Sequence, residues 1–329
     1  MRHIIHLLTL LVFCLSCRSQ VPTTKEKIKN DLTEKNLKGK IKSLAESHYD
    51  IVEKFGDMQK GNLQNKIVYQ YNSNGKETEN ATYYESGSKP ASKNTTKYDV
   101  KGNKIQLSIY DFEGTVIFNY KYDSKGNLTE ESQPNFSKIV YKYNEQNKLI
   151  DKSEYKKYIK GFQLESKDIF KYDERGNQIE WASYKGDGSL YSKTQYKFDS
   201  NNNLIELLYK SPDGKSDSRV TKKYDVSGNE IEYSSYDSKG RLSDHSSKKY
   251  NDNGTVSESY RSYSYESDPN TKYTEIYRSD NNGNQIEYSF GTSRTTYKYE
   301  FDKLGNWLKK TEFQNDKATS VTERTIQYY

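Results

Sequence analysis

The side chains best suited to nucleophilic or metal chemistry are few in this sequence of 329 residues. Both cysteines, Cys14 and Cys17, and two of the four histidines lie within residues 1–17. The other two histidines, His48 and His245, stand far apart and have no neighbours at the spacing of metal ligands. A Ser–His–Asp or Cys–His arrangement is therefore not indicated. We predict no catalytic residue, no metal site and no cofactor.

Carboxylates are abundant, with 46 Asp and Glu in all, so a glycosidase-like pair of acids is chemically available. Many of the aspartates, however, occupy one repeated place, the second residue of an aromatic-Asp-x-x-Gly-Asn segment. An Asp there bonds the backbone two residues further on, which favours a role in the turn over catalysis or calcium binding. The repeated aspartates are Asp99, Asp123, Asp173, Asp199, Asp225 and Asp302.

Aromatic residues are the other source of chemistry, because 32 tyrosines could stack on sugar rings or capture a peptide. Most of them follow the repeat and are expected to fill a β core. Trp307 occupies a column that is mostly polar in other copies, so we predict that it points outward and marks a binding face. Trp181 is predicted to lie in the core and is a weaker candidate. Tyr297 and Tyr299, which precede Trp307, complete the candidate ligand-binding set.

The elements that carry these residues form a sequence repeat. YDERGNQIE from Tyr172, FDSNNNLIE from Phe198 and YDVSGNEIE from Tyr224 begin 26 residues apart, with simpler turns between them. Tyr-Lys-Tyr segments before the turns alternate in the manner of a half-buried strand. We predict an all-β fold over residues 37–329, an antiparallel meander of tandem hairpins forming a long twisted or coiled sheet, with a short N-terminal signal or linker helix.

The first residues predict that the chain is exported to the cell envelope. An apolar run, residues 4–15, follows Arg2 and is too short for a transmembrane helix, which is typical of a signal peptide. Leu15, Ser16 and Cys17 resemble the end of a bacterial lipobox. The resemblance implies cleavage after residue 16, lipid attachment to Cys17 and an outer-membrane lipoprotein on the periplasmic or outer face. Residues 17–36 are predicted to be the lipidated cysteine and a flexible stalk.

The repeat unit resembles the YD repeat of the Rhs superfamily. The resemblance covers most of residues 66–310, with copies such as YDVKGNKI from Tyr98 and FDKLGNWL from Phe301. Together with the lipobox it is similar to small YD-repeat lipoproteins of the Bacteroidetes type. Large Rhs proteins coil such hairpins into a shell around a toxin, and that relation implies an accessory or immunity role as one alternative.

The favoured function is a non-enzymatic repeat lipoprotein that binds a partner on its sheet face. The partner is a polysaccharide or an envelope protein, and the sequence does not distinguish between these two classes of ligand. The formal net charge is +6 and the charges are interleaved, so nucleic acid is not expected. A glycan hydrolase with paired carboxylates in the irregular segment 255–275 is the enzymatic alternative.

Overall fold

The computed structural model describes residues 30–85, 87–265 and 268–329. The lipid-attachment residue predicted at Cys17, the signal peptide and most of the predicted stalk lie outside the described residues. Within these ranges, α1 is the one helix, and no helix is long and apolar enough to cross a membrane.

The described residues form α1 and 22 strands. Their bounds are α1 (Asp31–Glu34), β1 (Ile41–Lys54), β2 (Asp57–Tyr71), β3 (Glu77–Tyr84), β4 (Ser92–Tyr98), β5 (Lys104–Asp111), β6 (Gly114–Tyr122), β7 (Leu128–Gln133), β8 (Ser137–Tyr143), β9 (Leu149–Tyr158), β10 (Gly161–Tyr172), β11 (Gln178–Lys185), β12 (Leu190–Phe198), β13 (Leu204–Lys210), β14 (Ser218–Tyr224), β15 (Glu230–Tyr236), β16 (Leu242–Tyr250), β17 (Val256–Tyr265), β18 (Asp268–Ser279), β19 (Gln285–Phe290), β20 (Ser293–Phe301), β21 (Trp307–Gln314) and β22 (Lys317–Tyr328).

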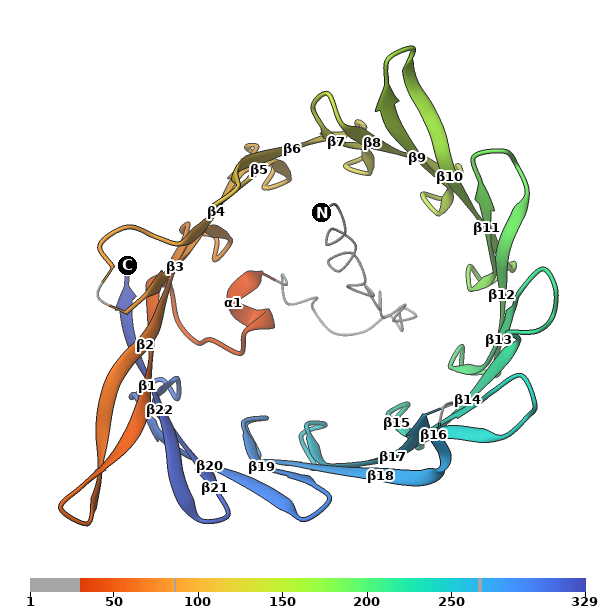
Figure 1. Cartoon of the computed structure of the whole chain (residues 1–329). Helices are drawn as coiled ribbons and strands as arrows, with labels where there is room; N and C mark the ends of the chain where they lie inside the picture. The colour runs from red at the N-terminus through yellow and green to blue at the C-terminus, as the bar shows by residue number, and fades with distance from the viewer. Residues whose placement is uncertain (1–29, 86, 266–267) are drawn as a thin grey trace, which may run out of the picture.

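The sheet closes into a barrel, as Figure 1 shows in a view along the axis. Each strand pairs antiparallel with its neighbours in sequence, and β1 pairs with both β2 and β22. Leu44 of β1 lies opposite Tyr69 on one side and Ile326 on the other. The pairing of β1 with β22 is called the seam below. It leaves the sheet without a free edge, which is the condition for a closed barrel.

This closure contradicts the predicted fold class, a long twisted or coiled sheet of YD/Rhs-like repeats. The prediction assumed that each hairpin contacts only its neighbours in sequence. In the structure, the first and last strands pair as well, with Ile41 of β1 opposite Tyr328 of β22 and Asp50 opposite Ser320. Pairing the two ends satisfies backbone groups that an open sheet of this size would leave exposed.

One rim of the barrel consists of short turns of the repeated type. In the turn after β4, the backbone N–H groups of Lys101 and Asn103 donate to Asp99 Oδ1 at 2.9 and 2.8 Å, and Asn103 Nδ2 donates to Asp99 Oδ2. Gly102 closes the turn with φ +82°, where a side chain would be strained. The structure confirms the turn role of Asp99. The same bonds recur at Asp123, Asp199, Asp225 and Asp280.

These turns predict how stability depends on acid. Hydrogen bonds from Asn103, Asn127 and Asn229 lower the pKa of the aspartate that each one contacts, Asp99, Asp123 and Asp225. A carboxyl with a folded-state pKa below its unfolded value stabilises the fold above the unfolded value, about 3.9, and the contribution is lost as pH falls through the folded value.

We therefore expect the melting temperature to fall as pH drops below about 4, with little change between pH 5 and 7. Thermal unfolding followed by circular dichroism across this range measures it. Asp225→Asn keeps most of the turn geometry and should slightly reduce the fall in melting temperature below pH 4. A melting temperature that stays constant down to pH 2 would contradict the argument.

Tyrosine hydroxyls join neighbouring strands at the same rim. Tyr250 of β16 donates to the carbonyl oxygen of Glu230 at 2.7 Å, where β15 begins. Equivalent bonds run from Tyr98, Tyr122, Tyr143, Tyr172, Tyr224 and Tyr299. A hydroxyl that bonds a backbone carbonyl of the preceding strand explains why most copies of the repeat place Tyr, and not only an apolar residue, before the turn.

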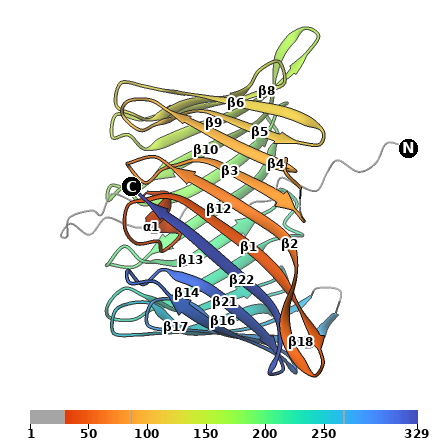
Figure 2. The same cartoon turned by 90° about the vertical axis from the view of Figure 1, so that its left-hand side faces the viewer.

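The N-terminal segment packs inside this rim at the seam. Asn30 caps α1, and its side chain also donates to the carbonyl oxygen of Asn74. Leu32 is 5% exposed and packs in a cluster with Leu37, Ile41, Leu44 and Tyr71. Figure 2 shows α1 and the C-terminus at the same end of the barrel. The last residues of the predicted stalk are therefore part of the folded barrel.

Candidate functional site

The inner face of the barrel wall can be assigned from α1. Figure 1 shows α1 within the ring, and Leu32 contacts Leu44 and Tyr71 in one buried cluster. Side chains alternate between the two faces of a strand, so the pairing register extends this assignment around the barrel. Tyr69, opposite Leu44, and Glu46, two residues on, face the lumen. The tyrosines of the Tyr-Lys-Tyr segments share this face, and the lysines between them point outward.

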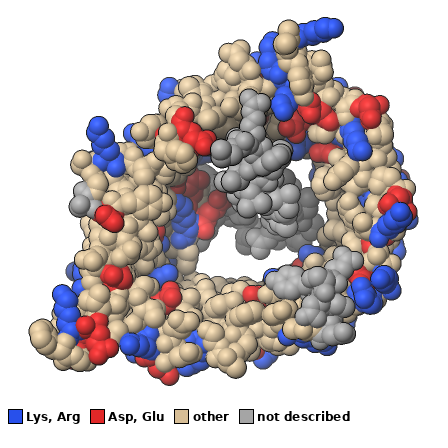
Figure 3. Space-filling view, in the orientation of Figure 1, with Lys and Arg blue, Asp and Glu red and all other residues tan. Residues whose placement is uncertain are grey.

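The lumen is wide and lined with aromatic rings. The interior of a barrel with this many strands is too wide for its own side chains to fill, and Figure 3 shows an opening within the ring. Ring contacts on the inner wall join Tyr277 to Tyr288 at 4.8 Å and Tyr273 to Phe290 at 6.1 Å between centroids. The wall therefore presents aromatic faces and edges to whatever enters.

Ion pairs alternate with the rings on the inner wall. Glu230 accepts from Lys222 and Lys248, both at 2.7 Å. Arg261 bridges the carboxylates of Asp244 at 2.8 Å and Glu275 at 3.7 Å. Lysine and hydrogen bonds lower the pKa of Glu230 against the opposing effect of its burial. These groups offer hydrogen-bond donors and acceptors beside the aromatic faces.

The structure brings three of the four predicted ligand-binding residues together. Tyr299 of β20 meets Trp307 of β21 edge-on at 6.1 Å, and the Lys310 ammonium lies 5.4 Å from the ring of Tyr297 and 6.0 Å from that of Trp307. Burial raises the pKa of Tyr299 to about 12. Trp307 is half-buried.

The predicted outward position of Trp307 is wrong, because the residue lies on the inner wall. The Arg324 guanidinium covers its ring at 3.3 Å, and Arg324 pairs with Glu46 at 2.6 Å across the seam. A register shift between Glu300 and Phe301 places Trp307 opposite Phe301, on the face of the tyrosines. The outward prediction depended on the polar residues that fill this column in other copies, but one of them, Glu230, also lies on the inner wall, where it pairs with Lys222 and Lys248.

Trp181 lies apart from this cluster, on β11. It faces the lumen from the inner wall and stacks on Phe170 with centroids 6.4 Å apart and planes at 14°. Its side chain is 38% exposed, so an aromatic face remains open to the lumen. The prediction that Trp181 belongs to a packed core does not fit this exposure.

Sequence reasoning missed Arg324 and Glu46. Their side chains are only 11% and 15% exposed, and burial lowers the pKa of Arg324. Strand alternation would place Arg324 on one face with Ile326. Nothing local in the sequence, however, indicates that β22 lies beside β1, and the pair spans 278 residues.

The enzymatic alternatives lack an assembled site in the described residues. His48 contacts Thr322 at 3.0 Å and His245 contacts Ser234 at 3.1 Å, but both hydroxyl-bearing residues are buried and no carboxylate bonds either ring. Burial lowers the pKa of His48. In segment 255–275, Glu258 pairs outward with Arg278, whereas Glu275 faces the lumen with Arg261. The two carboxylates therefore do not face each other.

No group of acids and histidines in the described part of the chain could hold a metal ion.

The outer face of the barrel is charged. In several repeats the lysine just before the last aromatic residue of the strand pairs with a Glu on the next strand, for example Lys171 with Glu180 at 2.9 Å and Lys249 with Glu258 at 2.8 Å. Similar pairs are Lys121–Glu130, Lys197–Glu206 and Lys223–Glu232. A wall that faces lipid instead carries an apolar band about 25 Å tall.

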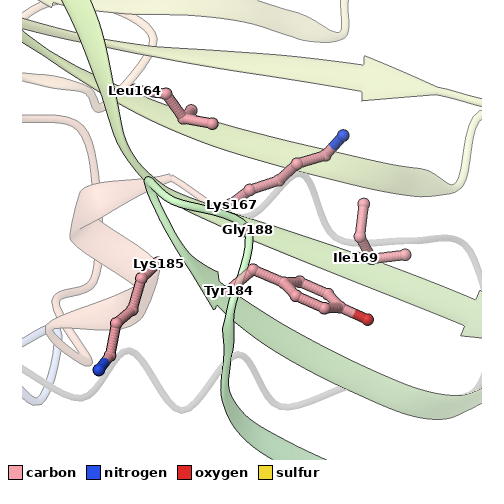
Figure 4. A pocket seen from close by; sticks show the side chains of 6 residues that line it. All are labelled: Leu164, Lys167, Ile169, Tyr184, Lys185 and Gly188. Atoms are coloured by element: carbon pink, nitrogen blue, oxygen red, sulfur yellow. The ribbon is translucent and has the colours of Figure 1, made fainter.

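Shallow grooves lie between these ion pairs and the rim of longer hairpins. The one in Figure 4, of about 260 Å³, lies between β10 and β11. Its lining residues are Leu164, Lys167, Ile169, Tyr184, Lys185 and Gly188. A second groove between β2 and β3 repeats the pattern with Leu63, Lys66, Val68, Tyr83, Glu85 and Gly87. Both are open and small beside the lumen.

No family model and no curated protein matches the chain. Among solved structures, a TcdB2-TccC3 complex aligns with 82% of this chain at 11% identity and a TM-score of 0.36, and the chain spans only 17% of that structure. A porin-like protein from Bacteroides uniformis aligns over 87% of this chain and 96% of its own length, at 8% identity and a TM-score of 0.30. These scores are too low to establish a shared fold or function.

Proposed function

We propose that the chain is a non-enzymatic barrel of the cell envelope that binds a polysaccharide along its inner wall. The observation that supports this proposal is the aromatic lining of an open lumen, in which Trp181 is 38% exposed. Aromatic faces stack on the apolar faces of sugar rings, and adjacent ion pairs supply hydrogen bonds to hydroxyls. The lumen is also the largest concave surface of the barrel, where a chain can contact several strands at once.

Two features support a location in the cell envelope. The lipobox-like end of the apolar leader favours export and lipid attachment at Cys17, and a closed barrel is consistent with such a location. The charged outer face favours a barrel held at a membrane surface over one threaded through the hydrocarbon. Metabolic labelling with a radioactive fatty acid tests the anchor, and Cys17→Ala should abolish the label.

The binding test uses the purified full chain against a panel of envelope and host polysaccharides in affinity electrophoresis. Trp181→Ala should weaken binding about tenfold, the equivalent of about 1.4 kcal/mol, because it removes one exposed stacking face. Trp307→Ala is a poor probe, since its ring supports Arg324 at the seam.

Tyr184→Ala is the matched control, because Tyr184 lies three residues further along β11 than Trp181 but lines the outer groove. Equal losses of affinity in Trp181→Ala and Tyr184→Ala would indicate that the polysaccharide does not bind in the lumen. A second outcome is that the wild-type chain retains no polysaccharide and instead binds an extended polypeptide that Trp181→Ala does not bind. That result would identify the ligand as a protein. Turnover of any retained glycan would contradict the non-enzymatic proposal.

A further inference from the structure

The rim opposite the short turns carries one hairpin end that combines exposed apolar residues with several lysines. The hairpin of β9 and β10 projects beyond the ring in Figure 1 and past the rim in Figure 2. Ile159 at its end is 106% exposed, and Tyr158 and Phe162 beside it are also exposed. Phe136, in the turn between β7 and β8, lies alongside, where its carbonyl accepts from the Lys157 backbone at 2.7 Å.

Lysines surround these apolar residues. The ammonium of Lys138 lies 5.0 Å from the ring of Phe162, that of Lys157 lies 5.1 Å from the same ring, and that of Lys156 lies 6.0 Å from the ring of Phe136. We call this group the lysine–aromatic tip. It consists of Phe136, Lys138, Lys156, Lys157, Tyr158, Ile159, Lys160 and Phe162.

The charge of the tip is not neutralised locally. Most lysines along the outer wall pair with a glutamate, but within the described residues none of the four tip lysines lies within ion-pair distance of a carboxylate. The two nearest acids in these hairpin ends are Glu154 and Glu165, and the Tyr158 hydroxyl donates to Glu165 at 2.6 Å. Four lysines against two acids leave a net charge of 4 − 2 = +2.

We propose that the lysine–aromatic tip docks on an anionic lipid bilayer. An aliphatic side chain at the end of a convex finger gains free energy when it enters the acyl region, while lysines and tyrosine at the base lie level with the headgroups. A polysaccharide would gain little from Ile159, because a sugar chain is bound by a flat or concave surface. Turns 186–189, 237–241 and 315–316 of this rim hold only polar residues and glycine. Phe55 (106% exposed) and Phe112 (92% exposed) stand in two other turns of the rim, but acids outnumber bases beside them, with Glu53, Lys54 and Asp57 in one turn and Asp111 and Glu113 in the other. Contact through the tip would therefore orient the barrel.

The test places a fluorescent reporter at the tip of the full chain. Every protein carries Cys17→Ala, so that no acyl chain can bind the vesicles, and the parent protein gives the background of Trp181 and Trp307. Ile159→Trp is compared with Lys239→Trp, which puts the same reporter in the polar turn between β15 and β16. Vesicles contain phosphatidylcholine and phosphatidylglycerol, with brominated acyl chains as the quencher.

When vesicles are added, we expect the fluorescence emission of Ile159→Trp to shift to shorter wavelength and to be quenched by the brominated chains. The emission of Lys239→Trp should stay unchanged. Combined Lys156→Gln, Lys157→Gln and Lys160→Gln should lower partitioning about a hundredfold, since each lysine near an anionic surface contributes about fivefold. The circular dichroism spectrum and melting temperature confirm that each variant is folded. Because the substituted side chains are exposed, loss of the fold is not expected.

Three outcomes would overturn the proposal. Equal quenching of both reporters would mean that the barrel adsorbs without using the tip. No quenching of Ile159→Trp, with the protein bound or unbound, would exclude insertion. Binding to dextran sulfate that depends on the three lysines, without any quenching by lipid, would identify the tip as a site for a soluble polyanion instead.

Discussion

Replacing Arg324 with methionine should destabilise the barrel by about 3–5 kcal/mol, the typical cost of leaving one partner of a buried ion pair without the other. The substitution keeps the bulk of the side chain but leaves the Glu46 carboxylate, 15% exposed, without its cation. It also removes the charge that lies over the Trp307 ring at 3.3 Å. The pair joins β22 to β1, so its loss weakens the one contact that closes the sheet.

Equilibrium denaturation by urea measures this change. Lys171→Met is the matched control, because Lys171 pairs with Glu180 on the outer wall, where its side chain is 62% exposed and solvent screens the pair, so that its loss should cost little stability. Glu46→Gln combined with Arg324→Met should recover most of the loss, since no unpaired charge remains. If Arg324→Met costs no more than Lys171→Met, the pair does not stabilise the seam.

Leu44→Ala should cost about 2–5 kcal/mol, as large-to-small substitutions in a packed core do. Leu44 is 1% exposed and contacts α1 through Leu32, whereas most of the wall is one sheet thick and only half-buried. A cavity at this position therefore removes contacts from both the seam and the N-terminal segment. Few other apolar side chains of the described barrel are so completely enclosed.

Hydrogen exchange by mass spectrometry distinguishes this local effect from a general one. In Leu44→Ala, peptides of β1, β22 and α1 should exchange faster, and those of β12 and β13 should not. Leu207→Ala on β13 is the control, because Leu207 is half-buried on the wall and should lose less stability. Faster exchange spread evenly around the barrel would show that the seam is no weaker than the rest.

The sequence predicted local structure far better than closure. Turn positions follow from Asp-x-x-Gly-Asn, because the bonds to Asp99 and the positive φ of Gly102 involve neighbours in the chain. The barrel depends instead on β1 meeting β22, and neither strand carries a local signal for the other. An open meander and a closed barrel share the same hairpins, so the alternation of residues does not separate them.

The candidate site was predicted in part for the same reason. The choice of Trp307, Tyr297 and Tyr299 did group three residues that lie together, because they occupy adjacent strands. Their direction was not predictable, since polar residues of the Trp307 column, such as Glu230, also face the lumen, and since Arg324 comes from the far end of the chain. The membrane anchor at Cys17 stays a prediction.

The position of the seam has a consequence for how the protein is made. β1 is the first strand to emerge during synthesis, and one of its two partners is the last. Until β22 is complete, the growing sheet carries two unpaired edges, and contacts this distant in sequence form slowly. Synthesis must therefore reach β22 before the barrel can protect its own backbone. The interval before the ends meet is when self-association competes with folding, and a chaperone that covers strand edges would act then.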